Sequence, residues 1–183
     1  MNRITIRRGV AGDARGISRT GRESFSRAFG HLYPLDVLER YLDDTYSEQK
    51  IASSFSNSRN VFIVADVDDE VVGFLKLKLA CHHQLIHGEC QVQVQKIYVL
   101  PNFANSGLGS CLMRSADAEI GGIRSVTAWL MVYEENRRAV CFYERFGYRV
   151  IGRDTYGFEG IRVPFTVMEK NYSNELRNTV DSR

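Results

Sequence analysis

A short loop with two glycines is the stretch of this chain best suited to chemistry. Apolar residues follow it at every fourth position: Leu108, Leu112, Ala116 and Ile120. This spacing predicts an amphipathic helix that begins near Gly107. The first N–H groups of a helix lack partners and attract an anion, and glycine at 107 and 109 removes the side chains that would shield them. The loop is therefore predicted to bind a phosphate group.

Two well-known phosphate-binding loops do not fit this stretch. A P-loop ends in Gly-Lys-Ser/Thr, whereas Gly109 is followed by Ser110 and Cys111. A dinucleotide-binding loop needs a third glycine near the amino terminus and an acidic residue about 20 positions later. A plain turn at the start of a helix remains the alternative. In either case Asn105 and Ser106 are expected to cap the helix with their side chains.

The strand before this loop changes its alternation part-way along. Apolar residues fall at even positions up to Val94 and at odd positions from Ile97 onward. Since a strand alternates with a period of two, the pattern slips by one residue around Gln95–Lys96. A β-bulge produces such a slip, and bulges often lie beside active sites. The alternative is that the strand ends at Gln95, but the β-forming run 97–99 favours a bulge.

The rest of the chain predicts a mixed α/β sheet with helices on both faces. Periodicity and turn residues give the following order: a strand at 4–8, helices at 11–29, 34–44 and 47–55, a hairpin of 61–65 and 71–79, the bulged strand, the helix after Gly107, a buried parallel strand at 126–133, a helix at 137–146, and strands at 148–153 and 161–169 joined by a loop at 154–160. One domain is expected over 1–170, with a polar tail at 171–183.

Composition is that of an ordinary globular protein. Apolar residues make up 44% of the 183 residues and charged residues 25%, with a net charge of +2. This balance gives no reason to expect nucleic acid or a membrane as a partner. The four cysteines are scattered, and the amino terminus lacks the apolar core of a signal peptide. We therefore expect free thiols in a cytoplasmic protein.

Several runs together resemble one family. The run Ile97-Tyr-Val-Leu-Pro101, between the bulged strand and the Gly-x-Gly loop, resembles the coenzyme A site of the GCN5-related N-acetyltransferases (GNAT). The run Trp129–Tyr148 resembles that family's second half. The runs Glu23–Phe29 and Leu38–Leu42 are similar to the bacterial branch that includes the PaiA-type spermidine/spermine acetyltransferases. The resemblance covers about residues 3–170.

The resemblance implies an enzyme that transfers an acetyl group from acetyl-coenzyme A to a primary amine. It also implies the acyl-CoA N-acyltransferase fold, a mixed, mostly antiparallel sheet of six to seven strands. The backbone of Ile97, Tyr98 and Val99 would hold the thioester and the pantetheine arm as an added strand does. The pyrophosphate would lie on a loop made by these residues: Ala104, Asn105, Ser106, Gly107, Leu108 and Gly109.

Tyr143 is implied to be the general acid that protonates the departing thiolate. It follows Asn136, which is predicted to cap the next helix, by two helical turns and lies on about the same face. The resemblance further implies that Asn136 contacts the coenzyme and that Arg145 pairs with a phosphate. A core role for Tyr143 is the alternative, because Val140, Tyr143 and Phe146 form an apolar stripe by spacing alone.

Two positions depart from the family pattern. Ala104 stands where the family's loop begins with Arg or Gln, so a charge-assisted contact worth roughly 1.5–3 kcal/mol is missing, and Asn105 is expected to substitute in part. Gln93 stands where relatives of this branch usually carry Glu. Glutamine cannot take a proton but can orient a water that does, so we predict deprotonation of the amine through water. Glu134 and Glu135 are the alternative bases.

Two further segments bear on ligands. The loop at 81–90 is rich in His and Cys, but its spacing matches no standard zinc pattern. We predict no metal there and a mobile loop beside the substrate. The helix over 36–44 carries an acidic face, which would attract a polycation or simply be solvated.

The prediction for function is acetylation of a small-molecule amine, with a polyamine as the first candidate. One alternative acceptor is an amino acid or the amino terminus of a peptide or protein. Another alternative is a coenzyme A-binding sensor without turnover, which Ala104 and Gln93 keep open. Family members are often dimers, so the resemblance also allows a homodimer.

Overall fold

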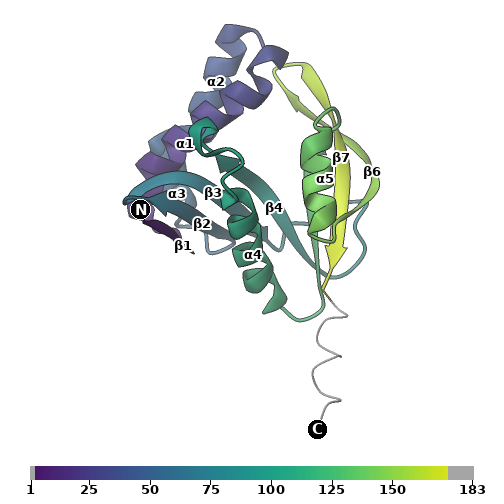
Figure 1. The fold of residues 1–183 in the computed structure, drawn as a ribbon. Coiled ribbons are helices and arrows are strands. Elements are labelled where there is room, and N and C mark those ends of the chain that lie inside the picture. Colours follow the sequence, from purple (N-terminus) through teal and green to yellow (C-terminus); the bar gives the residue numbers. More distant parts are fainter. Residues whose placement is uncertain (1–2, 173–183) are drawn as a thin grey trace.

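The computed structural model describes residues 3–172, which form a seven-stranded sheet in the order β1-β2-β3-β4-β5-β7-β6 (Figure 1). β4 and β5 are parallel, and every other neighbouring pair is antiparallel. The predicted mixed, mostly antiparallel sheet is therefore confirmed. The strands are β1 (Ile4–Arg8), β2 (Asn60–Val67), β3 (Glu70–Leu79), β4 (Cys90–Val99), β5 (Val126–Tyr133), β6 (Arg149–Phe158) and β7 (Ile161–Asn171).

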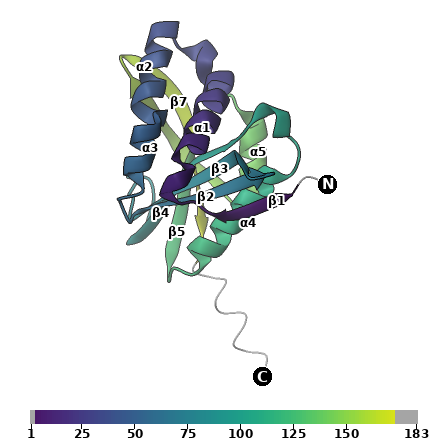
Figure 2. The same cartoon turned by 90° about the vertical axis from the view of Figure 1, so that its left-hand side faces the viewer.

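Helices cover both faces of the sheet. Figure 2 shows α1, α2 and α3 on one side of the sheet, with α4 and α5 on the other. No helix within residues 3–172 has both the length and the apolar character needed to cross a membrane. The helices are α1 (Ala14–Phe29), α2 (Leu35–Tyr46), α3 (Glu48–Ser54), α4 (Leu108–Gly121) and α5 (Arg137–Arg145), and the 3-10 turns are η1 (Ala11–Asp13), η2 (Gly30–Leu32) and η3 (Pro101–Phe103).

The two helical layers explain why β2 has no polar face. Val61 and Ile63 belong to the core under α4, whereas Phe62 and Val64 belong to the core under α1–α3. All four side chains are at most 4% exposed. A strand covered on both faces is apolar throughout instead of alternating. The same holds for most of β5, which pairs in parallel with β4 as its sequence predicts.

The prediction of a loop at residues 154–160 is wrong. β6 runs to Phe158 and β7 begins at Ile161, so only Glu159 and Gly160 connect them. Both have positive φ, 47° and 82°, as in the tight turns that join antiparallel strands. The segment lacks a strand pattern because most of its residues are exposed at the edge of the sheet. Its order comes from pairing with β7, which no local sequence signal reports.

The fold includes two residues beyond the expected boundary at residue 170. Asn171 is the last residue of β7, and Tyr172 is buried beside α4, where its hydroxyl donates to Asp117. The rest of the expected polar tail, 173–183, lies outside the described residues.

Candidate active site

β4 carries a bulge at the centre of the sheet. Lys96 pairs with Lys76 of β3, and Val94 pairs with Leu77, so Gln95 is an extra residue with no partner on β3. The predicted slip in alternation is therefore confirmed, and the strand continues through it. Because of the extra residue, the consecutive side chains of Gln95 and Lys96 both line one cleft, which is described below.

β4 and β5 separate beside this bulge. Their parallel pairing runs from Cys90 to Gln93 on β4 and ends there. From Val94 onward the edge of β4 that faces β5 has no strand partner within residues 3–172. The carbonyl of Val99 accepts a hydrogen bond of 3.3 Å from Ser24 Oγ, which ties this end of β4 to α1.

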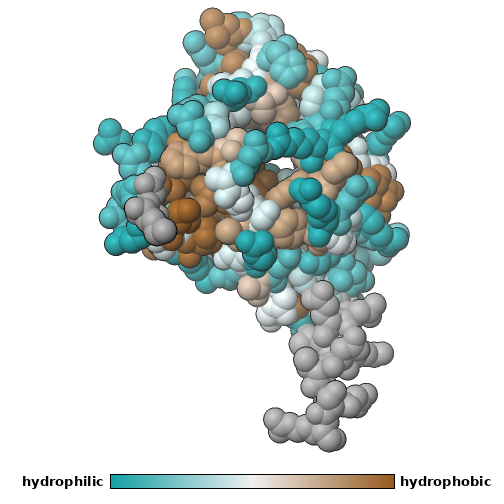
Figure 3. Space-filling view, viewed as in Figure 1, coloured by the Kyte–Doolittle hydropathy of each residue, from teal (hydrophilic) through white to brown (hydrophobic). Residues whose placement is uncertain are grey.

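A groove of about 960 Å³ occupies the space between the separated strands and between α4 and α5. We call it the α4–α5 groove. It is lined by residues 94–99 of β4, by the end of β5, by the loop before α4, by one side of α5 and by the last turns of α1. Figure 3 shows this face of the molecule hollowed at its centre.

The loop before α4 presents backbone amides without partners. Among the described residues, the N–H groups of Asn105 and of residues 107–110 donate to no acceptor, and the first bonded amide is that of Cys111, 3.1 Å from the Gly107 carbonyl. Gly107 has a φ of +86°, a conformation that other residues adopt at a cost. Unpartnered amides at the start of a helix are well suited to a phosphate.

The predicted capping by Asn105 and Ser106 is wrong. Gly107 occupies the capping position, and no side chain bonds the first turn of α4. Ser106 Oγ instead donates to the Phe103 carbonyl at 2.6 Å, and Asn105 Oδ1 accepts from Arg138 of α5. The amides of the first turn therefore remain free for a ligand.

Two arginines of α5 line the groove, of which the sequence analysis named one. Arg138, which it missed, reaches from the first turn of α5 to Asn105 across the mouth of the groove. Arg145, which it named, is exposed at the other end of the helix. Neither forms an ion pair with a carboxylate within residues 3–172. The groove therefore carries uncompensated positive charge.

Asn136 begins α5 as predicted. Its Oδ1 accepts a hydrogen bond of 3.0 Å from the Ala139 N–H, which makes it the helix cap. The residue also lines the groove. Since capping uses only the oxygen, the amide NH₂ group is left to donate to a ligand.

Tyr143 lines the inner part of the groove and is 8% exposed. Its ring packs against Phe142 and Tyr148, with centroids 5.3 and 6.1 Å apart, so the residue is also part of the core. Burial, with a smaller contribution from Tyr98, raises the pKa of Tyr143 well above its ordinary value. The hydroxyl is therefore protonated across the physiological range and can donate a hydrogen bond.

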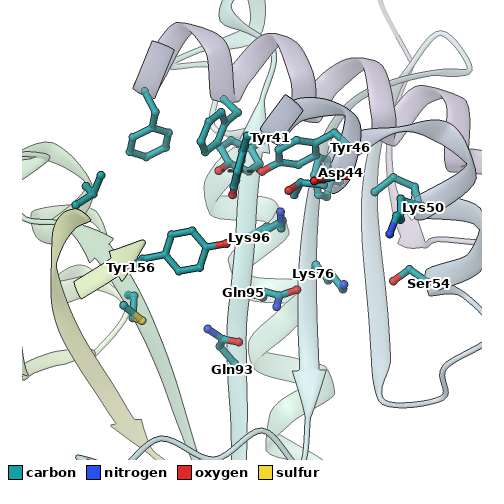
Figure 4. Close-up of a pocket in the computed structure, with 18 of the residues that line it drawn as sticks. Tyr41, Asp44, Tyr46, Lys50, Ser54, Lys76, Gln93, Gln95, Lys96 and Tyr156 are labelled. Carbon is teal, nitrogen blue, oxygen red and sulfur yellow. Dashed lines mark hydrogen bonds between the residues drawn. The ribbon is translucent and has the colours of Figure 1, made fainter. Parts of the chain in front are cut away.

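A second cleft, of about 440 Å³, lies on the other face of the sheet beneath α1–α3, and we call it the aromatic cleft (Figure 4). Figure 4 shows Tyr41 and Tyr46 of α2 beside Lys96, with Tyr156 entering from β6. Polar side chains of the strands form its floor: Lys76, Gln93, Gln95 and Lys96. The cleft and the α4–α5 groove share four lining residues, Phe29, Gln95, Lys96 and Tyr98. The two spaces therefore meet at the bulge.

The family model of the acetyltransferase (GNAT) domain matches residues 58–150, about half of the chain. The chain belongs to the GNAT family. It is therefore an acetyl-CoA-dependent N-acetyltransferase, as its sequence predicts.

Similar proteins agree with this assignment. An uncharacterized N-acetyltransferase of Lactobacillus delbrueckii subsp. lactis is 28% identical over 69% of this chain and 73% of its own length. The spermidine N(1)-acetyltransferase of Thermoplasma acidophilum is 23% identical over 93% of this chain and 99% of its own. The structure of the PaiA N-acetyltransferase from Thermoplasma acidophilum in complex with coenzyme A has a TM-score of 0.70 at 24% identity, covering 93% of this chain and 99% of that one. The ribosomal-protein-S18-alanine N-acetyltransferase from Escherichia coli has a TM-score of 0.69 at 18% identity, covering 96% and 98%.

The alternative bases of this acetyltransferase, Glu134 and Glu135, do not line either space. Glu134 pairs with Arg153 at 2.6 Å. Gln93 does line the cleft, and its Oε1 accepts from Cys81 Sγ at 3.5 Å. Of the three predicted candidates, only Gln93 lines one of the two spaces.

The His- and Cys-rich loop lines neither space itself, and it reaches the aromatic cleft only through the contact of Cys81 with Gln93. His83 packs on Trp129, with ring centroids 4.8 Å apart, and its Nε2 lies 3.0 Å from Asp154 Oδ2. Nδ1 accepts from the Leu85 N–H at 3.2 Å, so the proton of the neutral ring is on Nε2. Residues 3–172 contain no group of three or more His, Cys, Asp or Glu side chains suited to a metal. The loop fastens β6 to the sheet.

We predict that Arg138 supplies the positive charge that Ala104 lacks, because both residues line the same mouth of the groove. Arg138→Ala should raise KM for acetyl-CoA about 10-fold or more, because a charge-assisted hydrogen bond is worth roughly 1.5–3 kcal/mol. Steady-state kinetics with acetyl-CoA as the varied substrate measures it. Arg137→Ala is the matched control, because Arg137 is the exposed neighbour outside the groove. Equal KM values for the two variants would show that Arg138 does not contact the coenzyme.

Proposed function

We propose that this acetyltransferase transfers the acetyl group to the primary amine of a small molecule held in the aromatic cleft. The observation that carries the proposal is the meeting of groove and cleft at the bulge, through Gln95, Lys96 and Tyr98. An amine in the cleft and a thioester in the groove would then share one wall. The cleft volume of about 440 Å³ falls in the range of small-molecule sites.

The α4–α5 groove is the proposed coenzyme site. The free amides of residues 107–110 suit a pyrophosphate, and Arg138 and Arg145 add positive charge beside it. The unpaired edge of β4 at residues 97–99 suits the amide groups of a pantetheine arm. Bound there, the coenzyme supplies an activated carbonyl carbon. The N–H groups of the open β4 edge are the donors best placed to polarise that carbonyl.

Proton handling is assigned to two side chains. Gln93 orients a water that accepts the proton lost by the acceptor nitrogen, since glutamine itself cannot take one. The nitrogen forms a bond to the acetyl carbon, the carbon–sulfur bond breaks, and its electron pair stays on sulfur. Tyr143 donates its hydroxyl proton to that sulfur, and burial keeps this hydroxyl protonated until then. Asn136 lines the same groove and donates its amide NH₂ to the coenzyme.

The placement of Glu134 gives a second prediction. Glu134→Gln should leave the pH profile of kcat/KM unchanged, because the carboxylate is held by Arg153 and lines neither space. Gln93→Ala, by contrast, should lower kcat/KM by about 10-fold or more as the water loses its partner. A carboxylate-like limb in the profile that disappears in Glu134→Gln would overturn the role given to water.

The experiment for the proposed function is thiol release from acetyl-CoA across a panel of amines, run beside a binding measurement. The panel includes spermidine, because a relative from Thermoplasma is a spermidine N(1)-acetyltransferase. It also includes amino acids, simple primary amines and a short peptide with a free amino terminus. Turnover with a small amine supports the proposal. Turnover with the peptide alone, or binding of acetyl-CoA without thiol release on any amine, overturns it, and the second result indicates a sensor.

A further inference from the structure

Two lysines face one another on the floor of the aromatic cleft. Lys76 of β3 and Lys96 of β4 are paired in the antiparallel ladder, and both line the cleft. Like charges directly opposite on neighbouring strands destabilise a sheet. Neither lysine forms an ion pair with a carboxylate within the described part of the chain. Their Nζ atoms lie instead over aromatic rings, 5.3 Å from the Phe62 centroid and 4.0 Å from the Tyr46 centroid.

The environment of the pair disfavours two positive charges. Burial is the main cause that lowers the pKa of Lys76 to about 8 and that of Lys96 to about 7, with a smaller contribution from the charge of Lys78 on Lys76 and of Lys76 on Lys96. Both groups would gain from a negative charge placed between them. Among the described residues, no carboxylate lies beside the two lysines inside the cleft.

The other charged residues of the cleft do not neutralise the positive charge of Lys76 and Lys96. Asp44 and Lys50 also line it, but both are exposed at its rim, where water screens them. Three lysines and one aspartate therefore border the cleft. A polyamine would bring further positive charge to a floor that is already positive, and this charge argues against it.

A complementary group for the amine lies beside the lysines. Gln95 Oε1 is buried and has no hydrogen-bond partner among the described residues. Gln95 lines both the cleft and the groove, at the point where they meet. A buried carbonyl oxygen without a donor is costly unless a ligand supplies one. An N–H group of the acceptor amine, arriving next to the thioester, would supply it.

Resting on the proposed function, we propose that Lys76 and Lys96 form an anion-binding subsite, so that the acceptor is an amine that also carries a carboxylate, as an amino acid does. Gln95 Oε1 accepts from the amine at the bulge, and the lysine pair binds the carboxylate beyond it. The tyrosine and phenylalanine side chains that line the cleft contact the apolar part of the acceptor between them.

The first test needs no variant and compares matched acceptors that differ only in the carboxylate. The pairs are phenylalanine with phenethylamine, tyrosine with tyramine and lysine with cadaverine, and spermidine is assayed beside them. We expect at least a 10-fold higher kcat/KM for the carboxylate-bearing member of a pair that is turned over. Equal values within every pair, or spermidine as the best acceptor, would overturn the inference while leaving the proposed function intact.

A phosphate group shares the charge of a carboxylate, so a second comparison separates them. γ-Aminobutyrate and phosphoethanolamine have the same number of bonds between the amine nitrogen and the central atom of the anion. A higher kcat/KM for γ-aminobutyrate supports the carboxylate. A higher value for phosphoethanolamine would overturn it.

Variants then test the lysines themselves. Lys96→Met and Lys76→Met should each raise KM for the carboxylate-bearing amine about 10-fold and remove the preference over its partner. Turnover of the carboxylate-free amine should be retained. Lys78→Met is the matched control, since Lys78 lies two residues further along β3, on the same face, but outside the cleft. Loss of turnover on every amine in a folded Lys96→Met protein would make Lys96 part of the chemistry and overturn its role as an anion ligand.

Failure of the proposed function and failure of the anion subsite give different results. If acetyl-CoA binds but no amine of any kind is acetylated, the proposed function fails and the inference fails with it. If amines are acetylated with no preference for a carboxylate, only the inference fails.

Discussion

Tyr143→Phe should lower kcat about 100-fold, in line with the loss of one positioned proton donor. The substitution removes only a hydroxyl that has no hydrogen-bond partner among the described residues and leaves the ring packed against Phe142 and Tyr148. Folding and KM for acetyl-CoA should therefore change little. The effect falls on kcat because the hydroxyl acts when charge develops on sulfur. Steady-state kinetics measures both parameters, and thermal unfolding checks the fold.

Tyr148→Phe is the control for this prediction. Tyr148 is buried in the same core and lines neither the groove nor the cleft, so its loss of a hydroxyl should leave kcat unchanged. The raised pKa of Tyr143 adds a second readout. Because the folded protein keeps this hydroxyl protonated above the usual range for tyrosine, kcat should not fall through tyrosine ionisation as the pH approaches 10. A Tyr143→Phe enzyme with a kcat within threefold of the parent would remove Tyr143 from the mechanism.

Lys96→Met should stabilise the protein at pH 7, even though it damages the proposed subsite. The pKa of Lys96 in the folded protein is about 7, against an ordinary value of 10.5, mainly because of burial. Between these two pH values the unfolded chain binds more protons than the folded one, so the free energy of unfolding rises with pH. Below pH 7 the cost of charging this lysine is fully present. Methionine has a similar length and no charge, and it can keep the contact with the Tyr46 ring.

The size of this gain in the free energy of unfolding follows from the lowered pKa of Lys96. Partial exposure and the lost cation–π contact reduce it to on the order of 2 kcal/mol at pH 7. For a chain of this length that corresponds to roughly 4–8 °C in Tm. Denaturant unfolding at pH 7 and at pH 10 measures it, and the advantage of the variant should shrink at the higher pH. A variant less stable than the parent at pH 7 would mean that Lys96 is better solvated than its contacts indicate.

The parts of the site that the sequence predicts are those that depend on residues close together in the chain. The bulge changes the parity of apolar positions between Val94 and Ile97, and the loop before α4 places glycine where φ is positive. Both signals lie within a few residues, so no knowledge of distant segments is needed. Asn136 is similar, because capping depends on the residues that follow it.

The residues that the sequence analysis missed depend on contacts between distant segments. Lys76 and Lys78 alternate with leucines, a pattern typical of a solvent-exposed face, yet α1–α3 cover that face and put Lys76 inside a cleft. Arg138 is one of two adjacent arginines, and only the approach of α5 to Asn105 distinguishes it from Arg137. Tyr156 belongs to the segment that was predicted to be a loop, and pairing of β6 with β7 brings it to the cleft.

The single wall between groove and cleft has a kinetic consequence. The two spaces extend to opposite faces of the sheet and meet at the bulge, so neither substrate blocks the entry of the other. Both can be bound before the acetyl group moves, and the enzyme never has to carry the acetyl group itself. Double-reciprocal plots at several fixed acceptor concentrations should therefore intersect, and parallel lines would indicate a shuttling enzyme.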